Sequence, residues 1–305
     1  MKAPILVVLA AGMGSRYGGL KQMEKIGKGG EVLLDYSVFD AVKSGFEKIV
    51  FIIRHDIEED FRRLVLARME SKVKCELAFQ DPDTLIPSDI FRAAQEAGRT
   101  KPWGTGHALI CAADKLDSPF TVINADDFYG REAFAVMGKH LIGGESGSSI
   151  VPYKLEKTLS PQGTVSRGVC EVGSGFLVSV DELTAIEKKD GKIFNTAPDG
   201  SVRELLPDTP VSMNFWGFSP DILPEFKKYF DDYLKNFAAD PAGQIKSECF
   251  IPKAVDHFIK QGLTKVKVLS ADSHWFGVTY KEDREAAVNK LNEMESAGVY
   301  PSVLW

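Results

Sequence analysis

The segment ILVVLAAGMGSRYGGLKQ, residues 5–22, joins an apolar run to a glycine-rich loop. Ile5–Leu9 is short and rich in aliphatic residues, as strands buried on both faces are. Four glycines follow, with Arg16 and Lys21 among and after them. A glycine loop at the end of a buried strand offers backbone N–H groups to an anion, and the two cations add charge. The segment therefore predicts a phosphate-binding loop, with a glycine-rich surface turn carrying two solvated cations as the alternative.

The spacing of this loop excludes two common phosphate motifs. The dinucleotide fingerprint G-x-G-x-x-G fails because Tyr17 takes the place of its third glycine. The P-loop G-x-x-x-x-G-K-[ST] fails because Leu20 takes the place of its lysine. The remaining interpretation is a loop around a nucleoside triphosphate, in which Arg16 and Lys21 face the phosphates.

Hydrophobic patterning predicts an α/β protein. In the first half, apolar runs alternate with amphipathic stretches, which indicates a mostly parallel sheet with helices on both faces. From about Ser149 short strand candidates follow one another, so we expect a β-rich section before helices return. The predicted strands are Ile5–Leu9, Ile49–Ile53, Cys75–Phe79, Phe120–Asn124, Ser149–Tyr153, Val169–Val172, Phe176–Val180, Lys192–Asn195 and Lys265–Leu269, and the predicted helices are Leu34–Ser44, Phe61–Met69, Thr105–Asp114, Leu223–Phe237, Pro252–Gln261 and Glu282–Ala297.

Composition narrows the class of protein. The chain has 305 residues and a net charge of -6, which argues against nucleic acid as a partner. Its four cysteines are widely spaced and form no Cys-x-x-Cys pair, so the sequence predicts neither a zinc site nor disulfides. The apolar run at the N-terminus is too short for a signal peptide or a membrane span. We expect a cytoplasmic enzyme without a membrane partner, and the sequence leaves open whether it forms a homo-oligomer.

The segment LAAGMGSR, followed by Lys21, resembles the signature loop of the sugar-phosphate nucleotidyltransferases, L-x-G-G/A-x-G-[ST]-R, with Ala11 at its first glycine. The resemblance implies a Rossmann-like single domain, residues 1–305, with a nucleotide-binding half (1–148) and a sugar-phosphate-binding half (149–305). It implies Mg²⁺ as cofactor and catalytic roles for Arg16 and Lys21. The residues that it assigns to binding the nucleotide in this loop are Leu9, Ala10, Ala11, Gly12 and Gly14.

A second segment, WGTGHAL (103–109), is similar to the family's G-T-x-x-A-L. The resemblance implies that Gly104 permits close approach of the base and that Thr105 caps the following helix. Uridylyl- and thymidylyl-transferring relatives read the base with a glutamine upstream of that glycine. Here Arg99 stands at that position, with Gln95 nearby, so the identity of the base stays open.

The acidic segment INADDFYG (123–130) follows a predicted buried strand, where α/β sheets place ligands. Asp126 matches the family aspartate that holds Mg²⁺ and counts as both catalytic and metal-binding; capping of a turn is the alternative. Relatives carry a second aspartate where this chain has Gly277. The candidates to replace it are Asp127, Asp272, water, or the phosphates of the nucleotide itself.

Three later segments resemble the sugar-phosphate site. TAIEKK (184–189) assigns Glu187 to sugar hydroxyls and Lys188 to the phosphate, although a solvated charge pair is an equal alternative. SMNFWGF (212–218) assigns Asn214 to the sugar, and SECFIP assigns Glu248 to the same site.

The predicted activity is transfer of a nucleotidyl group from an NTP to a sugar 1-phosphate with release of pyrophosphate, with UTP and glucose 1-phosphate as the first pair to consider. One alternative is transfer to a non-sugar acceptor of the molybdenum cofactor or phosphocholine type. A second is a non-catalytic sensor of nucleotide sugars, which Gly277 would favour.

Overall fold

The computed structural model describes residues 2–12, 25–145, 147–161, 163–277 and 283–305. In this part of the chain one large sheet contains thirteen strands. They are β1 (Ile5–Leu9), β2 (Lys48–Ile53), β3 (Lys74–Phe79), β4 (Phe120–Asn124), β6 (Ser148–Ile150), β7 (Tyr153–Lys154), β8 (Val165–Gly173), β9 (Phe176–Lys189), β10 (Lys192–Thr196), β11 (Val202–Leu205), β12 (Pro210–Ser212), β13 (Trp216–Phe218) and β14 (Val266–Val268). A separate pair consists of β5 (Asp127–Phe128) and β15 (Phe276–Gly277).

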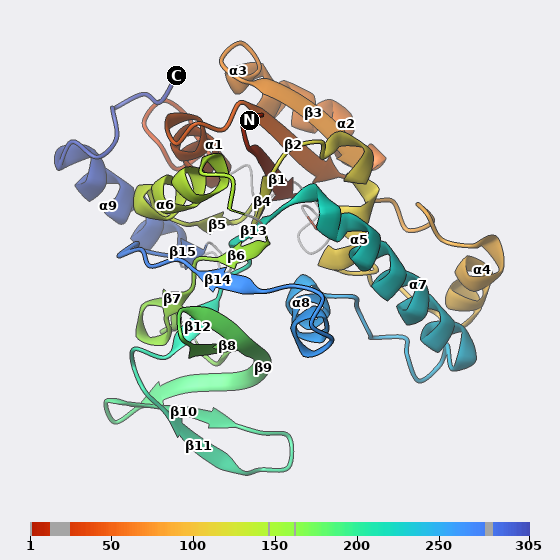
Figure 1. Cartoon of the computed structure of the whole chain (residues 1–305). Helices are drawn as coiled ribbons and strands as arrows, with labels where there is room; N and C mark the ends of the chain where they lie inside the picture. The colour runs from red at the N-terminus through yellow and green to blue at the C-terminus, as the bar shows by residue number, and fades with distance from the viewer. Residues whose placement is uncertain (1, 13–24, 146, 162, 278–282) are drawn as a thin grey trace.

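The sheet runs in the order β3-β2-β1-β4-β13-β6-β14-β9-β8-β12-β7, and β10 and β11 continue beside β9 (Figure 1). Strands β3, β2, β1 and β4 are parallel, and β13 is antiparallel to both β4 and β6. Beyond β14 the pairing is antiparallel throughout. The predicted architecture is confirmed: a mostly parallel core continues into a β-rich section.

Helices cover both faces of the parallel region. They are α1 (Leu33–Lys43), α2 (Glu58–Phe61), α3 (Ala67–Met69), α4 (Ser88–Glu96), α5 (Thr105–Cys111), α6 (Arg131–Ile142), α7 (Leu223–Ala239), α8 (Ile251–Lys260) and α9 (Asp283–Ser296). Because side chains alternate along a strand, Leu6 and Val8 pack with α1, α2 and α6, while Ile5 and Val7 pack with α5, α7 and α8. Helix α9 and the C-terminal residues form a third apolar cluster with α1 and β5.

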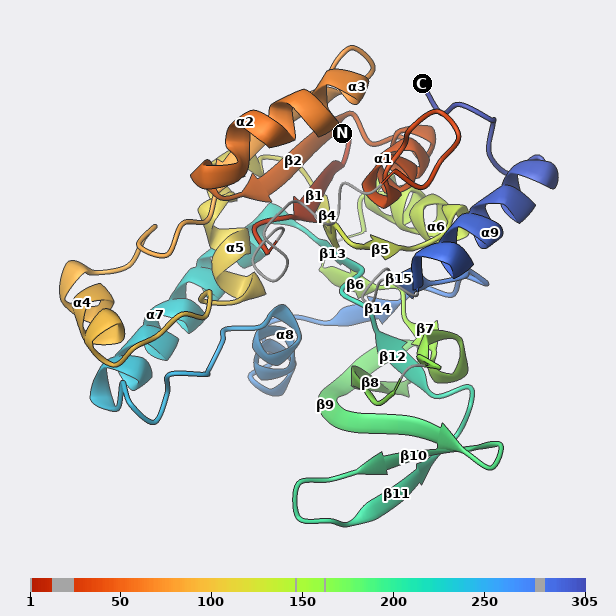
Figure 2. The ribbon, with the colours of Figure 1, turned by 180° about the vertical axis from the view of Figure 1, so that it is seen from behind.

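The β-rich section projects from the helical layers. In Figures 1 and 2 the β10–β11 ribbon extends away from the parallel sheet, at the end of the long, curved strand β9. Strand β9 bulges against β8, since Val165 pairs with Ile186 but Arg167 pairs with Leu183. Ala185 lies in this bulge with a φ of 55°. An extra residue in one strand reverses the alternation of side chains beyond it, so residues on the two sides of Ala185 face differently from a regular strand.

Most predicted elements are present with shifts of one or two residues. The interpretation of Ser149–Tyr153 as one strand is wrong, because β6 and β7 are separated at Val151 and Pro152. Helices α4 and α6 were not predicted. The expected capping of a helix by Thr105 is also wrong: Gly104 occupies the N-cap of α5, and the Thr105 hydroxyl accepts a hydrogen bond from the Ile251 N–H at 3.0 Å.

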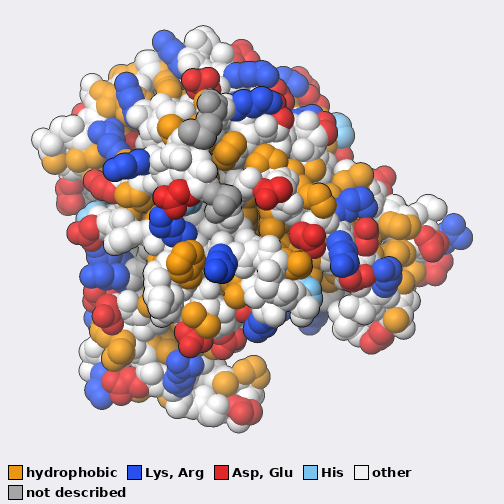
Figure 3. All heavy atoms as spheres, viewed as in Figure 1, with side chains coloured by type: hydrophobic (Ala, Val, Ile, Leu, Met, Phe, Trp, Pro, Cys, Tyr) orange, Lys and Arg blue, Asp and Glu red, His pale blue; other side chains and the backbone are white. Residues whose placement is uncertain are grey.

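Surface charge is mixed on the face shown in Figure 3, where acidic and basic side chains are interspersed. On this face, selective attraction of an anionic ligand would depend on local arrangements of side chains. Among the helices that the model describes, none combines the length and the apolar character needed to cross a membrane.

Candidate active site

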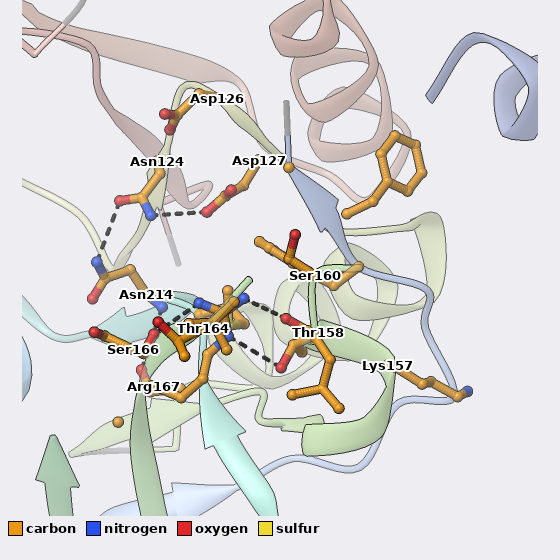
Figure 4. Close-up of a pocket in the computed structure, with 18 of the residues that line it drawn as sticks. Asn124, Asp126, Asp127, Lys157, Thr158, Ser160, Thr164, Ser166, Arg167 and Asn214 are labelled. Carbon is orange, nitrogen blue, oxygen red and sulfur yellow. Dashed lines mark hydrogen bonds between the residues drawn. The ribbon is translucent and has the colours of Figure 1, made fainter. Parts of the chain in front are cut away.

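A cavity of about 730 Å³ opens beside the carboxyl end of β4, between the parallel region and the β-rich section (Figure 4). Its volume is in the range of small-molecule sites. The polar and charged side chains that line it come from five parts of the chain: Thr105; Asn124, Asp126 and Asp127; Lys157, Thr158, Ser160, Thr164, Ser166, Arg167 and Glu182; Ser212 and Asn214; and Lys290.

The two adjacent carboxylates follow β4 directly. Asp127 is buried, and its Oδ2 accepts hydrogen bonds from Asn124 Nδ2 at 2.9 Å and from the Tyr129 hydroxyl at 3.2 Å. Burial, and next the charge of Asp126, raise the pKa of Asp127 above its usual range. Asp126 also lines the cavity. A cation beside this pair would lower the cost of holding both carboxylates ionised.

The Asn124 amide connects these acids to a second polar segment. Its Oδ1 accepts a hydrogen bond from Asn214 Nδ2 at 3.3 Å, and Asn214 Oδ1 accepts one from Trp216 Nε1 at 3.3 Å. Asn214 has a φ of 61°, a left-handed conformation that asparagine tolerates better than most residues. The predicted sugar-contacting residue Asn214 therefore lies in the cavity wall, fixed on the same network as Asp127.

Gly277 lies directly across from Asp127 in the β5–β15 pair. A Cβ atom at position 277 would come within 2.9 Å of Asp127 Oδ1, so the glycine makes room for that carboxylate. Asp272, another candidate to replace the missing acid, pairs with Lys157 at 2.9 Å and its side chain is 90% exposed. Of the two, Asp127 is the one that lines the cavity.

Asp126 and Asp127 fit a Mg²⁺ ion chemically. Mg²⁺ prefers hard oxygen ligands and usually takes one or two protein carboxylates, with water and phosphate oxygens completing its shell. Both carboxylates line the same cavity, where burial and the charge of Asp126 raise the pKa of Asp127, so a bound cation would favour the ionised form of both.

Arg167, on β8, was not predicted as a site residue. Its Nε donates to Thr158 Oγ1 at 3.1 Å, Nη1 donates to the Ser166 carbonyl at 2.7 Å, and Nη2 donates to the Thr158 carbonyl. The guanidinium carbon lies 5.1 Å from the centre of a Trp275 ring. These contacts hold a cation in the wall of the cavity.

The structure does not bring every predicted sugar-site residue into the cavity. Glu187 and Lys188 do not line it, and the Glu187 carboxylate pairs with Lys189 at 2.7 Å. Glu182, which is on the same strand as Glu187 and pairs with Gly168 of β8, does line the cavity. Glu248 lies elsewhere and pairs with Lys101 at 3.2 Å. Glu187 lies beyond the bulge at Ala185, in the part of β9 that pairs with β10.

The segment around Gly104 serves chain packing. Gly104 has a φ of 100°, and a Cβ there would lie 2.5 Å from the Cys249 carbonyl oxygen. The close approach expected of this glycine is therefore made by the Cys249 backbone. Thr105, the next residue, does line the cavity.

Arg99, which stands where relatives carry a base-reading glutamine, has a structural role. It donates hydrogen bonds to four backbone carbonyls, those of Pro102, Gln244, Ile245 and Ser247. Its guanidinium carbon also lies 4.3 Å from the centre of a Trp103 ring. Gln95 is exposed on α4. These contacts tie the loop before α5 to the segment after α7, and they leave the base unassigned.

The nucleotide loop begins beside the acidic pair. Ala10 N–H donates to the Ile52 carbonyl at 2.8 Å, and the Leu9 carbonyl accepts from Ala125 N–H at 3.2 Å. Ala11 and Gly12 follow, and no atom of the described residues lies within 4 Å of the position that a Cβ would take at Gly12. The predicted residues Gly14, Arg16 and Lys21 lie outside the described residues.

The charged cavity lies at the carboxyl end of β4, with Asp126 and Asp127 directly after that strand, which is where α/β folds place their ligands. The sequence profile described as "Nucleotidyl transferase" matches residues 5–167, which is more than half of the chain. The chain belongs to this family, and the predicted class of enzyme is confirmed. No curated protein sequence matches the chain significantly.

Solved structures share the fold over nearly the whole chain. A proposed glucose-1-phosphate thymidylyltransferase from Bacillus anthracis aligns with a TM-score of 0.61 and 12% identity, over 94% of this chain and 95% of that one. The inositol-1-phosphate CTP transferase from T. maritima gives 0.61 and 12%, over 95% and 97%. A UDP-glucose pyrophosphorylase complexed with UDP-glucose gives 0.57 and 15%, over 96% and 99%. At these identities the likeness shows a common fold.

Proposed function

We propose that the protein transfers a nucleotidyl group from an NTP to a sugar 1-phosphate and releases pyrophosphate. The observation that carries the proposal is one cavity that holds the Asp126–Asp127 pair at the end of β4 and a cation, Arg167, in its β-rich wall. Two phosphorylated substrates need such an arrangement of opposite charges. The structural neighbours whose names include a sugar or cyclitol phosphate support an acceptor of this class.

In the proposed reaction an oxygen of the acceptor phosphate attacks the α-phosphorus of the NTP. The bond from that phosphorus to the oxygen bridging the α- and β-phosphates breaks, and pyrophosphate leaves with the electron pair. Such chemistry depends on positioning and on neutralising charge. We assign Arg16 and Lys21 to the phosphates of the NTP, and the backbone of residues 10–14 to the nucleotide.

Asp126 and Asp127 are the residues that we assign to holding Mg²⁺, which would neutralise charge on the phosphates when bound. Asn124 and Tyr129 orient Asp127 through their hydrogen bonds to Oδ2. Asn214 and Glu182 line the wall where acceptor hydroxyls would bind. UTP with glucose 1-phosphate remains the first pair to test. We further propose that residues 1–148 and 149–305 act as nucleotide and acceptor halves of a single cytoplasmic enzyme.

Pyrophosphate release tests the proposal. Purified protein with Mg²⁺ receives UTP, dTTP, CTP, GTP or ATP together with each member of a sugar 1-phosphate panel, and Lys21→Ala serves as the matched control. Release with one pair, absent from the control, supports the proposal and identifies both substrates. Silence with every sugar while a non-sugar phosphorylated acceptor reacts would move the acceptor to another class. Silence with all acceptors, with an NTP still raising the melting temperature, would point to the sensor.

A further inference from the structure

Arg167 is a cation in the wall of the cavity without a carboxylate in contact. Within the described residues no ion pair forms at its guanidinium, and the three acceptors that it contacts are neutral oxygens of Thr158 and Ser166. The other cations of the cavity are engaged differently. Lys157 pairs with Asp272, and Lys290 lies 5.0 Å above the ring of Phe276.

The hydrogen-bond inventory of Arg167 leaves capacity for a ligand. A guanidinium has five N–H groups, and three of them are used by Thr158 and Ser166. One N–H on each terminal nitrogen has no acceptor among the described residues. Two N–H groups on the two ends of a planar fork match two oxygens of one phosphate group.

The environment makes an anionic partner favourable. Burial lowers the pKa of Arg167, and the charges of Asp127 and Glu182 act against that shift. A partly buried charge without a counter-ion in contact raises the free energy of the folded protein, and an anion that binds there would offset this penalty. Trp275 and Thr158 fix the side chain before any ligand arrives, so little side-chain entropy is lost on binding.

The position of Arg167 indicates that the anion it binds belongs to the acceptor and not to the nucleotide. Arg167 belongs to the β-rich section, where it pairs with Leu183 and is next to Gly168, the partner of Glu182. In Figure 4, Arg167 and Asp126 lie on opposite sides of the view, with Asn124 and Asn214 between them. The nucleotide loop starts on the Asp126 side, since Leu9 contacts Ala125.

We infer that Arg167 binds the phosphate monoester of the acceptor substrate. This inference rests on the proposed function, because it names the residue that holds the second substrate of that reaction. The sequence does not indicate this role, because Arg167 lies outside the predicted strands and outside every predicted site segment.

Two substitutions test the inference. Arg167→Met keeps most of the volume and removes the charge, and Arg167→Lys keeps the charge but loses the fork. In the transfer reaction we expect the acceptor KM to rise about tenfold to a hundredfold in Arg167→Met and less in Arg167→Lys, with the KM for the NTP unchanged. Inorganic phosphate should raise the melting temperature of the wild-type protein more than that of Arg167→Met, since Arg16 and Lys21 remain in both.

Two controls separate binding from scaffolding. Thr158→Val removes a side-chain acceptor of Arg167 while its charge remains, and Arg203→Met removes an exposed cation on β11. If Arg167 only braces the Thr158 segment, Thr158→Val and Arg167→Met will raise the acceptor KM alike, which contradicts the inference. An unchanged acceptor KM in Arg167→Met, or equal stabilisation of the wild-type protein and Arg167→Met by phosphate, also contradicts it. A wild-type protein that releases no pyrophosphate with any pair would refute the proposed function instead.

Discussion

Replacing Gly277 by aspartate tests whether Asp127 occupies the space beside it. A Cβ at position 277 lies 2.9 Å from Asp127 Oδ1 and 3.3 Å from a Trp275 ring carbon. The φ of Gly277 is outside the left-handed region, so a side chain there meets atoms rather than backbone strain. Gly277→Ala isolates this steric effect, which we expect to cost about 1–3 kcal/mol of unfolding free energy.

Gly277→Asp adds a like charge to that clash. Two carboxylates about 4 Å apart repel each other by about 4 kcal/mol at an effective dielectric constant of about 20. We therefore expect Gly277→Asp to be less stable than Gly277→Ala by up to about 4 kcal/mol in metal-free buffer above neutral pH. Mg²⁺ should recover more stability for the aspartate variant than for the alanine variant, since a bound cation neutralises the acids.

Urea unfolding followed by tryptophan fluorescence measures these differences, with and without Mg²⁺. The double variant Gly277→Asp with Asp127→Asn should regain most of the electrostatic part, as a double-mutant cycle would show. Equal unfolding free energies for Gly277→Asp and Gly277→Ala in metal-free buffer would refute the reasoning, because the two carboxylates would then not face each other.

Three further predictions concern the nucleotide loop and the packing beside the cavity. Lys21→Ala and Arg16→Ala should each lower kcat about a hundredfold or more in a pyrophosphate-release assay. The free energy of unfolding in urea should change by less than about 1 kcal/mol. A fully active variant or an unfolded one would count against the proposed roles of these residues. Gly104→Ala should lower the free energy of unfolding in urea by about 3 kcal/mol, because its Cβ would lie 2.5 Å from the Cys249 carbonyl oxygen. Near-wild-type stability would mean that this contact can relax. Burial lowers the pKa of His107 from 6.5 to about 4, so between these pH values protons bind preferentially to the unfolded chain. The free energy of unfolding should therefore fall by about 3 kcal/mol as the pH drops through this window. His107→Gln should remove that part of the pH dependence, and an unchanged curve of stability against pH would contradict the prediction.

The parallel region could be predicted from sequence because its strands are continuous apolar runs. Ile5–Leu9 and Phe120–Asn124 match β1 and β4 to the residue, since strands buried on both faces are bounded sharply by polar or turn residues. Helix α6 was missed although Ala133, Phe134, Met137 and Leu141 have helical spacing and are buried. A search for that spacing after Gly130 would have found it.

Site residues next to buried strands were easier to predict than those in the β-rich section. Asp126 follows β4, and its position in the cavity is what the general rule for α/β sheets implies. Glu187 was predicted from its resemblance to the family's Glu-Lys pair, and Glu182 was not predicted as a site residue. Glu182 lines the cavity where β9 pairs with Gly168 of β8, whereas Glu187 lies where β9 pairs with β10, and the local sequence does not reveal either pairing.

Arg167 could not be predicted for a related reason. Trp275 is distant in sequence, Glu182 approaches through the pairing of β8 with β9, and Thr158 approaches through the loop before β8. Sequence patterns indicate charge and periodicity, but the burial of a single arginine beside a cavity depends on tertiary packing.

The fate of oxygen atoms in the acceptor phosphate tests the central claim most directly. The wild-type protein would be given Mg²⁺, the active NTP and a sugar 1-phosphate whose phosphate oxygens all carry ¹⁸O, and both products would be weighed by mass spectrometry. Attack by an acceptor oxygen on the α-phosphorus predicts a nucleotide sugar that retains every labelled oxygen, together with unlabelled pyrophosphate. A nucleoside monophosphate without attached sugar, or label in the pyrophosphate, would contradict nucleotidyl transfer to the acceptor.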